Sequence, residues 1–273
     1  TSKDKRARTH RLQTRTIWQW TILALIAGVV LGGLYIINHP PRHVAEQTDA
    51  VVIDQLAPHH PNEALRFSVR ESLERRGFTV VEYEGDEVDV GLYRSLGAAG
   101  CRVLFIRSHA GLLVLEGEDV EHITALFTNE PYSRFKYVDE QMRDRVLVVR
   151  PFETDAELSF GISPYFVTHS MEGCLPSTLV ILVGCSCLAE TDLAKAFLGR
   201  GASAVVSWSD SVSLDYLDAA AGCFVGSLFE DGLTIEDAVA ATMAEYGPDP
   251  ESGARLTYFP PAAGRYSVDD LTG

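Results

Sequence analysis

A histidine and a cysteine stand where two apolar segments of the chain end. His109 follows the run 101–106, and Cys185 follows the run 179–183 after one glycine. Short apolar runs of this kind are typical of buried strands, and in open α/β sheets chemistry gathers at the carboxyl ends of strands. A thiol beside an imidazole is an arrangement that makes a cysteine nucleophilic near neutral pH. The sequence therefore predicts a catalytic dyad of His109 and Cys185.

The other cysteines leave two alternatives open. Cys187 is a rival nucleophile, and Cys185 with Cys187 is also a candidate redox pair. The five cysteines, at 101, 174, 185, 187 and 223, are odd in number and scattered, unlike the dense framework of a small disulfide-stapled domain. No second Cys/His pair stands at zinc-ligand spacing. We expect neither a metal nor another cofactor.

Strands and helices are expected to alternate from residue 49 onward. The apolar patterns predict strands at 50–53, 79–83, 101–106, 179–183 and 202–208, and helices at 61–77, 88–96, 190–198, 214–229 and 235–246. Short strands are also expected at 112–115 and 146–149. Alternation of this kind predicts an α/β domain over 49–273, a three-layer sandwich with a mostly parallel central sheet between helices.

The order of these parts resembles a known class of enzymes. A strand leads to the His109 loop and a hairpin region, and a later strand ends at Cys185; a helix and a small-residue strand ending at Trp208 follow. This succession resembles the caspase-like (clan CD) cysteine peptidases. The segment VGCSCLAETDLAKAFLGRGASAVVSWSDSVS, residues 183–213, is most similar to their CHAT and clostripain–gingipain-like branches.

The resemblance implies a peptidase mechanism with assigned residues. Cys185 would attack a peptide carbonyl, and His109 would protonate the leaving amine. Backbone groups around Ala110, Gly111 and Gly184 would stabilise the oxyanion. The implied partner is a protein or peptide substrate.

Two further residues are implied to form a substrate pocket. In the clostripain-like branch an acidic residue near the position of Asp210 recognises a basic side chain at the cleavage site. A carboxylate binds Arg or Lys through charge-assisted hydrogen bonds. Trp208 would wall the same pocket. The alternatives are a solvated loop aspartate and a tryptophan that packs at the edge of the sheet.

The chain departs from the family pattern at two places. The family commonly has glycine directly after the histidine, where this chain has Ala110, and Ser-Gly or Thr-Gly shortly after the cysteine, where this chain has Ser186-Cys187-Leu188. Both positions lie where the backbone approaches a substrate closely. These differences favour an alternative function, a catalytically inactive caspase-fold module that is tethered to the membrane for binding or assembly.

The first residues differ in kind from the rest of the chain. Residues 1–16 carry six basic residues and one acidic residue, and residues 17–37 carry no charge. As a helix the uncharged run would span about 30 Å, which matches the hydrocarbon core of a bilayer. The sequence predicts a single-pass signal anchor at 17–37 and a linker at 38–48. The basic tail would stay cytoplasmic and the main domain would lie outside the cytoplasm.

The charge of the chain excludes one class of partner. The net charge is −15, and the basic tail means that the remaining residues are more acidic still. A strongly acidic domain repels polyanions, so nucleic acid is not expected as a partner.

Overall fold

The computed structural model describes residues 20, 23–29, 48–115, 121–151 and 157–272. The expected basic tail lies outside these ranges, as do most of the anchor 17–37 and nearly all of the linker 38–48. Residues 23–29 are helical, and within the described ranges no helix is both long and apolar enough to cross a membrane. The chain divides into two compact units, residues 1–42 and 43–273. The second unit holds all the elements that follow.

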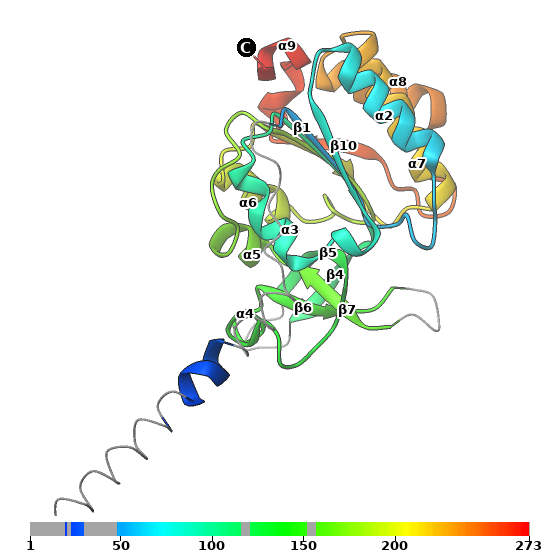
Figure 1. Ribbon diagram of the computed structural model, residues 1–273. Coiled ribbons are helices and arrows are strands. Elements are labelled where there is room, and N and C mark those ends of the chain that lie inside the picture. The colour runs from blue at the N-terminus through cyan, green and yellow to red at the C-terminus, as the bar shows by residue number, and fades with distance from the viewer. Residues whose placement is uncertain (1–19, 21–22, 30–47, 116–120, 152–156, 273) are drawn as a thin grey trace, which may run out of the picture. The chain divides into compact units, whose positions relative to one another are not determined.

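A six-stranded sheet forms the centre of this unit, in the order β10-β9-β8-β3-β1-β2 (Figure 1). Its strands are β1 (Ala50–Asp54), β2 (Val80–Glu84), β3 (Val103–Arg107), β8 (Leu179–Val183), β9 (Ala204–Trp208) and β10 (Leu256–Phe259). The first five strands are mutually parallel, and only β10 runs antiparallel, beside β9. The expectation of an α/β fold with a mostly parallel central sheet is confirmed.

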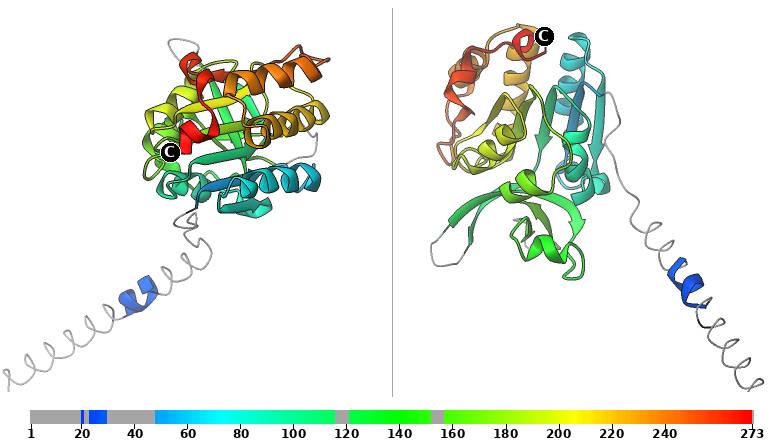
Figure 2. Two further views of the ribbon diagram at one scale, coloured as in Figure 1. Left: turned by 90° about the horizontal axis from the view of Figure 1, so that it is seen from above. Right: turned by 90° about the vertical axis from the view of Figure 1, so that its left-hand side faces the viewer.

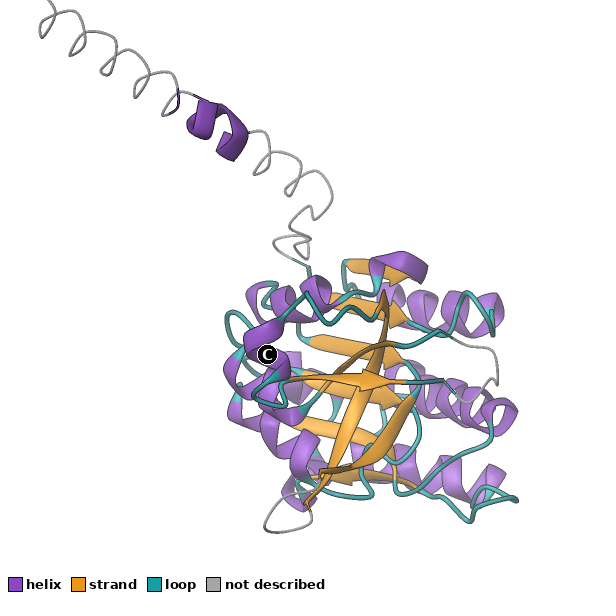
Figure 3. Ribbon diagram, turned by 90° about the horizontal axis from the view of Figure 1, so that it is seen from below, coloured by secondary structure: helices purple, strands orange, loops and turns teal. Residues whose placement is uncertain are grey.

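Helices cover both faces of the central sheet, which is why every residue of β1, β3, β8 and β9 is buried. On one face, side chains of α2 (Glu63–Arg75), α7 (Leu214–Val225) and α8 (Ile235–Tyr246) share an apolar cluster with the strands. On the other face, α3 (Val90–Ser95), α5 (Pro164–His169) and α6 (Asp192–Gly199) do the same. Figure 3 shows the strands in the interior with the helices around them.

Polar caps mark where several helices begin. Asn62 accepts a hydrogen bond from the Leu65 N–H and starts α2, and Thr234 accepts one from the Asp237 N–H and starts α8. Gly247, with φ of 68°, ends α8 in a backbone conformation that favours glycine. The expected helix 235–246 coincides with α8, whereas the expected helix 61–77 extends two residues beyond α2 at each end.

A second sheet has four antiparallel strands in the order β4-β5-β7-β6, and it lies at one end of the central sheet (Figures 1 and 2). Its strands are β4 (Ala110–Leu115), β5 (Glu121–Pro131), β6 (Val146–Val149) and β7 (Ser159–Ile162). The expected strands 112–115 and 146–149 are present. The segment between β5 and β6 contains the short helix α4 (Val138–Gln141).

Shorter elements complete the unit. They are the 3₁₀ turns Gly85–Glu87, Leu96–Ala98 and Pro261–Arg265, the π-helical turn Gly226–Glu230 that continues α7, and α9 (Val268–Thr272). The three apolar clusters of buried residues all lie between residues 50 and 268. Residues 43–273 therefore carry a hydrophobic core of their own.

Candidate active site

His109 and Cys185 follow neighbouring strands of the central sheet. β3 and β8 pair in parallel, with Arg107 opposite Val183, and each of the two candidate residues lies two positions further along its strand. The Ser108 N–H donates to the Val183 carbonyl at 3.0 Å, which extends the pairing beyond the strand ends. The two residues thus leave the sheet side by side at its carboxyl edge.

The backbones of the two strand ends touch at Gly184. A Cβ atom at this position would lie 2.5 Å from the Ser108 carbonyl oxygen and 3.3 Å from the Ala110 Cβ. Real Cβ atoms do not come that close to a backbone oxygen, so glycine is required here for steric reasons. This close approach holds the loop of Cys185 against the loop of His109.

The His109 loop is held by side chains of other elements. The His109 N–H donates to Gln55 Oε1 at 2.9 Å, and its carbonyl accepts from the Phe127 N–H at 3.0 Å. The imidazole ring lies edge-on to the ring of His60, with centroids 6.1 Å apart, and 5.9 Å from the ring of Phe127. The ring is therefore placed between the loop after β1 and strand β5.

Gln55 is a functional-site candidate that sequence reasoning missed. Besides accepting from His109, it donates from Nε2 to Asn129 Oδ1 at 2.7 Å. Asn129 in turn donates from Nδ2 to the carbonyls of Gln55 and Gly85 at 3.0 and 2.9 Å. The available signal was the position of Gln55, directly after the last residue of a buried strand. No feature of the β5 sequence distinguishes Asn129 as a functional residue.

Ala110 and Gly111, expected as backbone donors, begin β4. Ala110 pairs with Leu126, and Gly111 with Ala125. The Phe127 N–H donates to the His109 carbonyl directly before this pairing begins. β4 is the outer strand of its sheet. Ala110 and Gly111 therefore lie at the start of an edge strand, directly after His109.

The Cys185 thiol is half-buried and bonded to the loop after β9. Its Sγ donates to the Val212 carbonyl at 3.5 Å and accepts from the Val212 N–H at 3.5 Å. Burial raises the pKa of this thiol; the Val212 N–H offsets part of that effect, and the carboxylates of Asp249 and Asp210 raise the pKa further. In this arrangement the sulfur is protonated at neutral pH.

Cys187, two residues after Cys185, is buried in the core. Its side chain is 0 % exposed and belongs to the apolar cluster beneath the sheet, and burial raises its pKa to about 12. Ser186, between the two cysteines, has a left-handed backbone with φ of 55°, which sends the neighbouring side chains to different surroundings. Burial thus disfavours Cys187 as a nucleophile relative to Cys185.

Asp210 lies beside the Cys185 loop, whereas Trp208 is part of the core. The Ser186 N–H donates to the Asp210 carbonyl at 2.9 Å, and the exposed Asp210 carboxylate accepts from the Ser211 N–H at 2.7 Å. Trp208 is 1 % exposed and packs in the cluster under α7 and α8. Asp210 is therefore accessible to a ligand near Cys185, and the indole of Trp208 is not.

The effect of Asp210 on the thiol is testable by alkylation. Because the Asp210 carboxylate disfavours the thiolate, Asp210→Asn should lower the pKa of Cys185 and move its alkylation profile to lower pH. The measurement is the rate of iodoacetamide labelling at Cys185, read by peptide mass spectrometry across a pH series. Asp215→Asn, an exposed residue of α7, is the matched control. Identical profiles for the two variants would contradict the electrostatic coupling.

A buried ion network lies directly before His109. Arg107 is 2 % exposed and donates from Nε and Nη2 to both carboxylate oxygens of Asp218, each at 2.7 Å. Its Nη1 donates to Asp54 Oδ1 at 2.9 Å and to the His60 carbonyl at 3.0 Å. Burial raises the pKa of Asp54, although Arg107 opposes that shift. The network joins β1, β3 and α7 at the edge that carries the candidate dyad.

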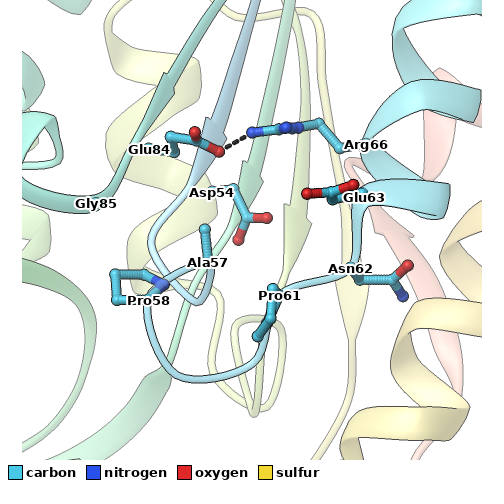
Figure 4. A pocket seen from close by; sticks show the side chains of 9 residues that line it. All are labelled: Asp54, Ala57, Pro58, Pro61, Asn62, Glu63, Arg66, Glu84 and Gly85. Atoms are coloured by element: carbon cyan, nitrogen blue, oxygen red, sulfur yellow. Dashed lines mark ion pairs between the residues drawn. The ribbon is translucent and has the colours of Figure 1, made fainter.

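An acidic pocket of about 260 Å³ opens at the carboxyl ends of β1 and β2. Figure 4 shows the carboxylates of Asp54, Glu63 and Glu84 around one space, with Arg66 reaching across it to form an ion pair with Glu84. Neither His109 nor Cys185 lines this pocket. Within the described ranges, no three His, Cys, Asp or Glu side chains are grouped as metal ligands.

The comparisons with known proteins do not assign this chain to a family. Neither a protein-family model nor a curated protein matches the sequence. The chemistry of the site thus rests on the residues themselves: an imidazole and a protonated thiol on adjacent strand ends, backbone N–H groups beside them, and a carboxylate within electrostatic reach of the sulfur.

Proposed function

We propose that this chain is a membrane-anchored cysteine endopeptidase of caspase-like fold, with Cys185 as the nucleophile and His109 as the general acid. One observation carries the proposal. His109 and Cys185 follow adjacent parallel strands in register, and their loops touch at Gly184. In α/β sheets this carboxyl edge is where ligands bind.

The order of elements around the pair supports the same proposal. β3 leads to His109, the β4–β5 hairpin follows, β8 leads to Cys185, and α6 and β9 come next. This order of elements resembles that of the caspase-like peptidases. The central sheet also keeps β3 and β8 next to each other although 71 residues separate Arg107 from Leu179 and the second sheet lies between them in sequence.

The chemistry follows from the groups present. The Cys185 thiol would first give its proton to the neutral His109 imidazole. The resulting thiolate attacks the carbonyl carbon of a peptide, and a C–S bond forms as the oxygen becomes negative. The N–H groups of Ala110 and Cys185 would stabilise this oxyanion. The His109 imidazolium gives its proton to the leaving nitrogen as the C–N bond breaks, and water then hydrolyses the thioester.

A preference for a basic residue at the cleavage site is part of the proposal. The exposed Asp210 carboxylate raises the pKa of Cys185. A bound Arg or Lys side chain would neutralise that carboxylate and so favour the thiolate. The peptide or protein substrate would meet the domain outside the cytoplasm, with the anchor at residues 17–37 in the cell membrane.

A second function is favoured by a different observation. The Cys185 sulfur is bonded to the backbone of Val212 and has a raised pKa, while the His109 ring contacts His60 and Phe127. This arrangement suits a catalytically inactive caspase-fold module, tethered to the membrane, which binds or assembles partners without cleaving them.

The test that separates the two functions uses residues 43–273 and a thiol-directed peptide probe with arginine at the reactive end. The peptidase predicts covalent labelling of Cys185 and cleavage of arginyl peptides, with loss of both in Cys185→Ala and about a thousandfold lower turnover in His109→Ala. Cys223→Ala, at another half-buried thiol, should behave as the parent. Labelling that survives Cys185→Ala, or absence of turnover across a broad peptide library, would overturn the peptidase.

A further inference from the structure

The segment between β5 and β6 exposes three large apolar side chains to solvent. Phe135 is 77 % exposed, Met142 74 % and Val138 49 %. The first two are the most exposed large apolar side chains among the described residues from 48 onward. Val138 and Met142 are four residues apart, joined by the Met142 N–H to Val138 carbonyl bond of 3.0 Å, so they lie on one side of the turn. We call Phe135, Val138 and Met142 the apolar tip.

The apolar tip is held by a rigid turn. The Gln141 side chain donates from Nε2 to the carbonyls of Ser133 and Lys136. Glu130, which is nearly buried, accepts hydrogen bonds from the Tyr137 hydroxyl at 3.0 and 3.2 Å and from Lys136 Nζ at 2.9 Å. The exposure of the tip is therefore part of an ordered structure, and little conformational entropy is lost when a partner covers it.

Basic residues outnumber acidic residues in the segment that carries the apolar tip. Residues 131–150 contain five Lys or Arg and three acidic residues. Glu140 is turned inward to Arg94 at 2.8 Å, and the Arg134 guanidinium lies 4.7 Å from the centre of the Phe135 ring. Two of the five cations are paired with carboxylates, Lys136 with Glu130 and Arg143 with Asp139. The cation that the structure places against the apolar tip is Arg134.

The helices α7 and α8 lie in an acidic stretch of the chain. Residues 201–254, which include α7 and α8, contain ten acidic residues and no Lys or Arg. In Figure 1, α7 and α8 lie at the upper right, whereas α4 and β6 lie at the lower left. The helix α2 packs against α7 and carries Arg66, Arg70 and Arg75, so arginines of a neighbouring helix balance part of this acidic charge.

We propose that the apolar tip and Arg134 form a contact site for an anionic lipid bilayer. Aromatic and aliphatic side chains next to arginines are the composition that binds at the headgroup level, with the apolar groups inserted and the cations paired with lipid phosphates. A single weak site binds reversibly. Together with a tether such as the expected anchor at 17–37, it would hold the unit in one orientation on the bilayer.

The direct test uses residues 43–273, which carry their own core, with sedimentation of vesicles of phosphatidylglycerol or of phosphatidylcholine alone. We expect binding to phosphatidylglycerol vesicles that weakens as salt rises, and little binding to phosphatidylcholine. The double variant Phe135→Ser/Met142→Ser should bind at least about tenfold more weakly. Tyr246→Ser, which removes a 39 % exposed tyrosine from α8, is the matched control and should bind as the parent.

Insertion is checked separately by fluorescence. In residues 43–273 the only native tryptophan is Trp208, which is buried. Phe135→Trp should therefore give an emission maximum that moves to shorter wavelength with phosphatidylglycerol vesicles. Equal loss in the Tyr246 and Phe135/Met142 variants would overturn the proposal, as would absence of binding by the parent. Self-association in solution that the double variant abolishes would instead assign the tip to a second copy of the chain and also overturn it.

Discussion

Replacing Asp218 with alanine should destabilise the domain by about 3–5 kcal/mol, because it removes one partner of a buried charge and leaves Arg107 underneutralised. Asp218 holds both Nε and Nη2 of that arginine and also accepts from Asn62 Nδ2 at 2.9 Å. The cost arises mainly from the desolvated guanidinium, since loss of an exposed pair is worth far less.

Urea unfolding of residues 43–273 measures this effect, with the slope of the transition checked for constancy. Asp215→Ala is the matched control: it lies one turn earlier on α7, is exposed, and should cost only a few tenths of a kcal/mol through the helix dipole. Similar losses for the two variants would contradict the burial of the Arg107 network.

Gly184→Ala should separate the two strand ends that carry the candidate dyad. The new Cβ would lie 2.5 Å from the Ser108 carbonyl oxygen, and that oxygen is backbone, so β3 or β8 has to shift. We expect a loss of about 1–3 kcal/mol in unfolding free energy, the usual cost of overpacking. If His109 and Cys185 act together, turnover should fall by far more than stability, since their relative position changes.

Gly111→Ala provides the comparison, because a Cβ there meets no atom within 4 Å. That variant should be as stable as the parent or slightly more so, since alanine restricts the unfolded chain. Unfolding curves and peptide turnover on both variants form the experiment. A Gly184→Ala protein with parental stability and activity would show that the contact between the two loops is not required.

Local signals were enough to predict much of the central sheet. β8 and α8 coincide with the expected ranges 179–183 and 235–246 residue for residue, because one is an uninterrupted apolar run and the other has a clear cap and stop. β5 was missed because polar residues interrupt it. Thr124 and Thr128 are buried within it and bond to Asp192 and to the Phe160 carbonyl. A polar residue buried by a distant partner has no local signature.

The sequence likewise predicts only part of the candidate site. The strand-end positions of His109 and Cys185 could be predicted, since they depend on the apolar runs before them. The groups that hold them could not: Gln55 reaches Asn129 across 74 positions, and Arg107 reaches Asp218 across 111. Such pairs become visible only when the strand order is known. The burial of Trp208 likewise follows from the packing of α7 and α8 against β9.

The bond between Cys185 and Val212 has a consequence for how reactivity would be controlled. The sulfur cannot attack a carbonyl while both of its contacts are to the Val212 backbone. Any molecule that binds more tightly when Val212 has moved away shifts the equilibrium toward an accessible sulfur. Binding of that molecule and reactivity of the thiol would then be coupled through the position of Val212.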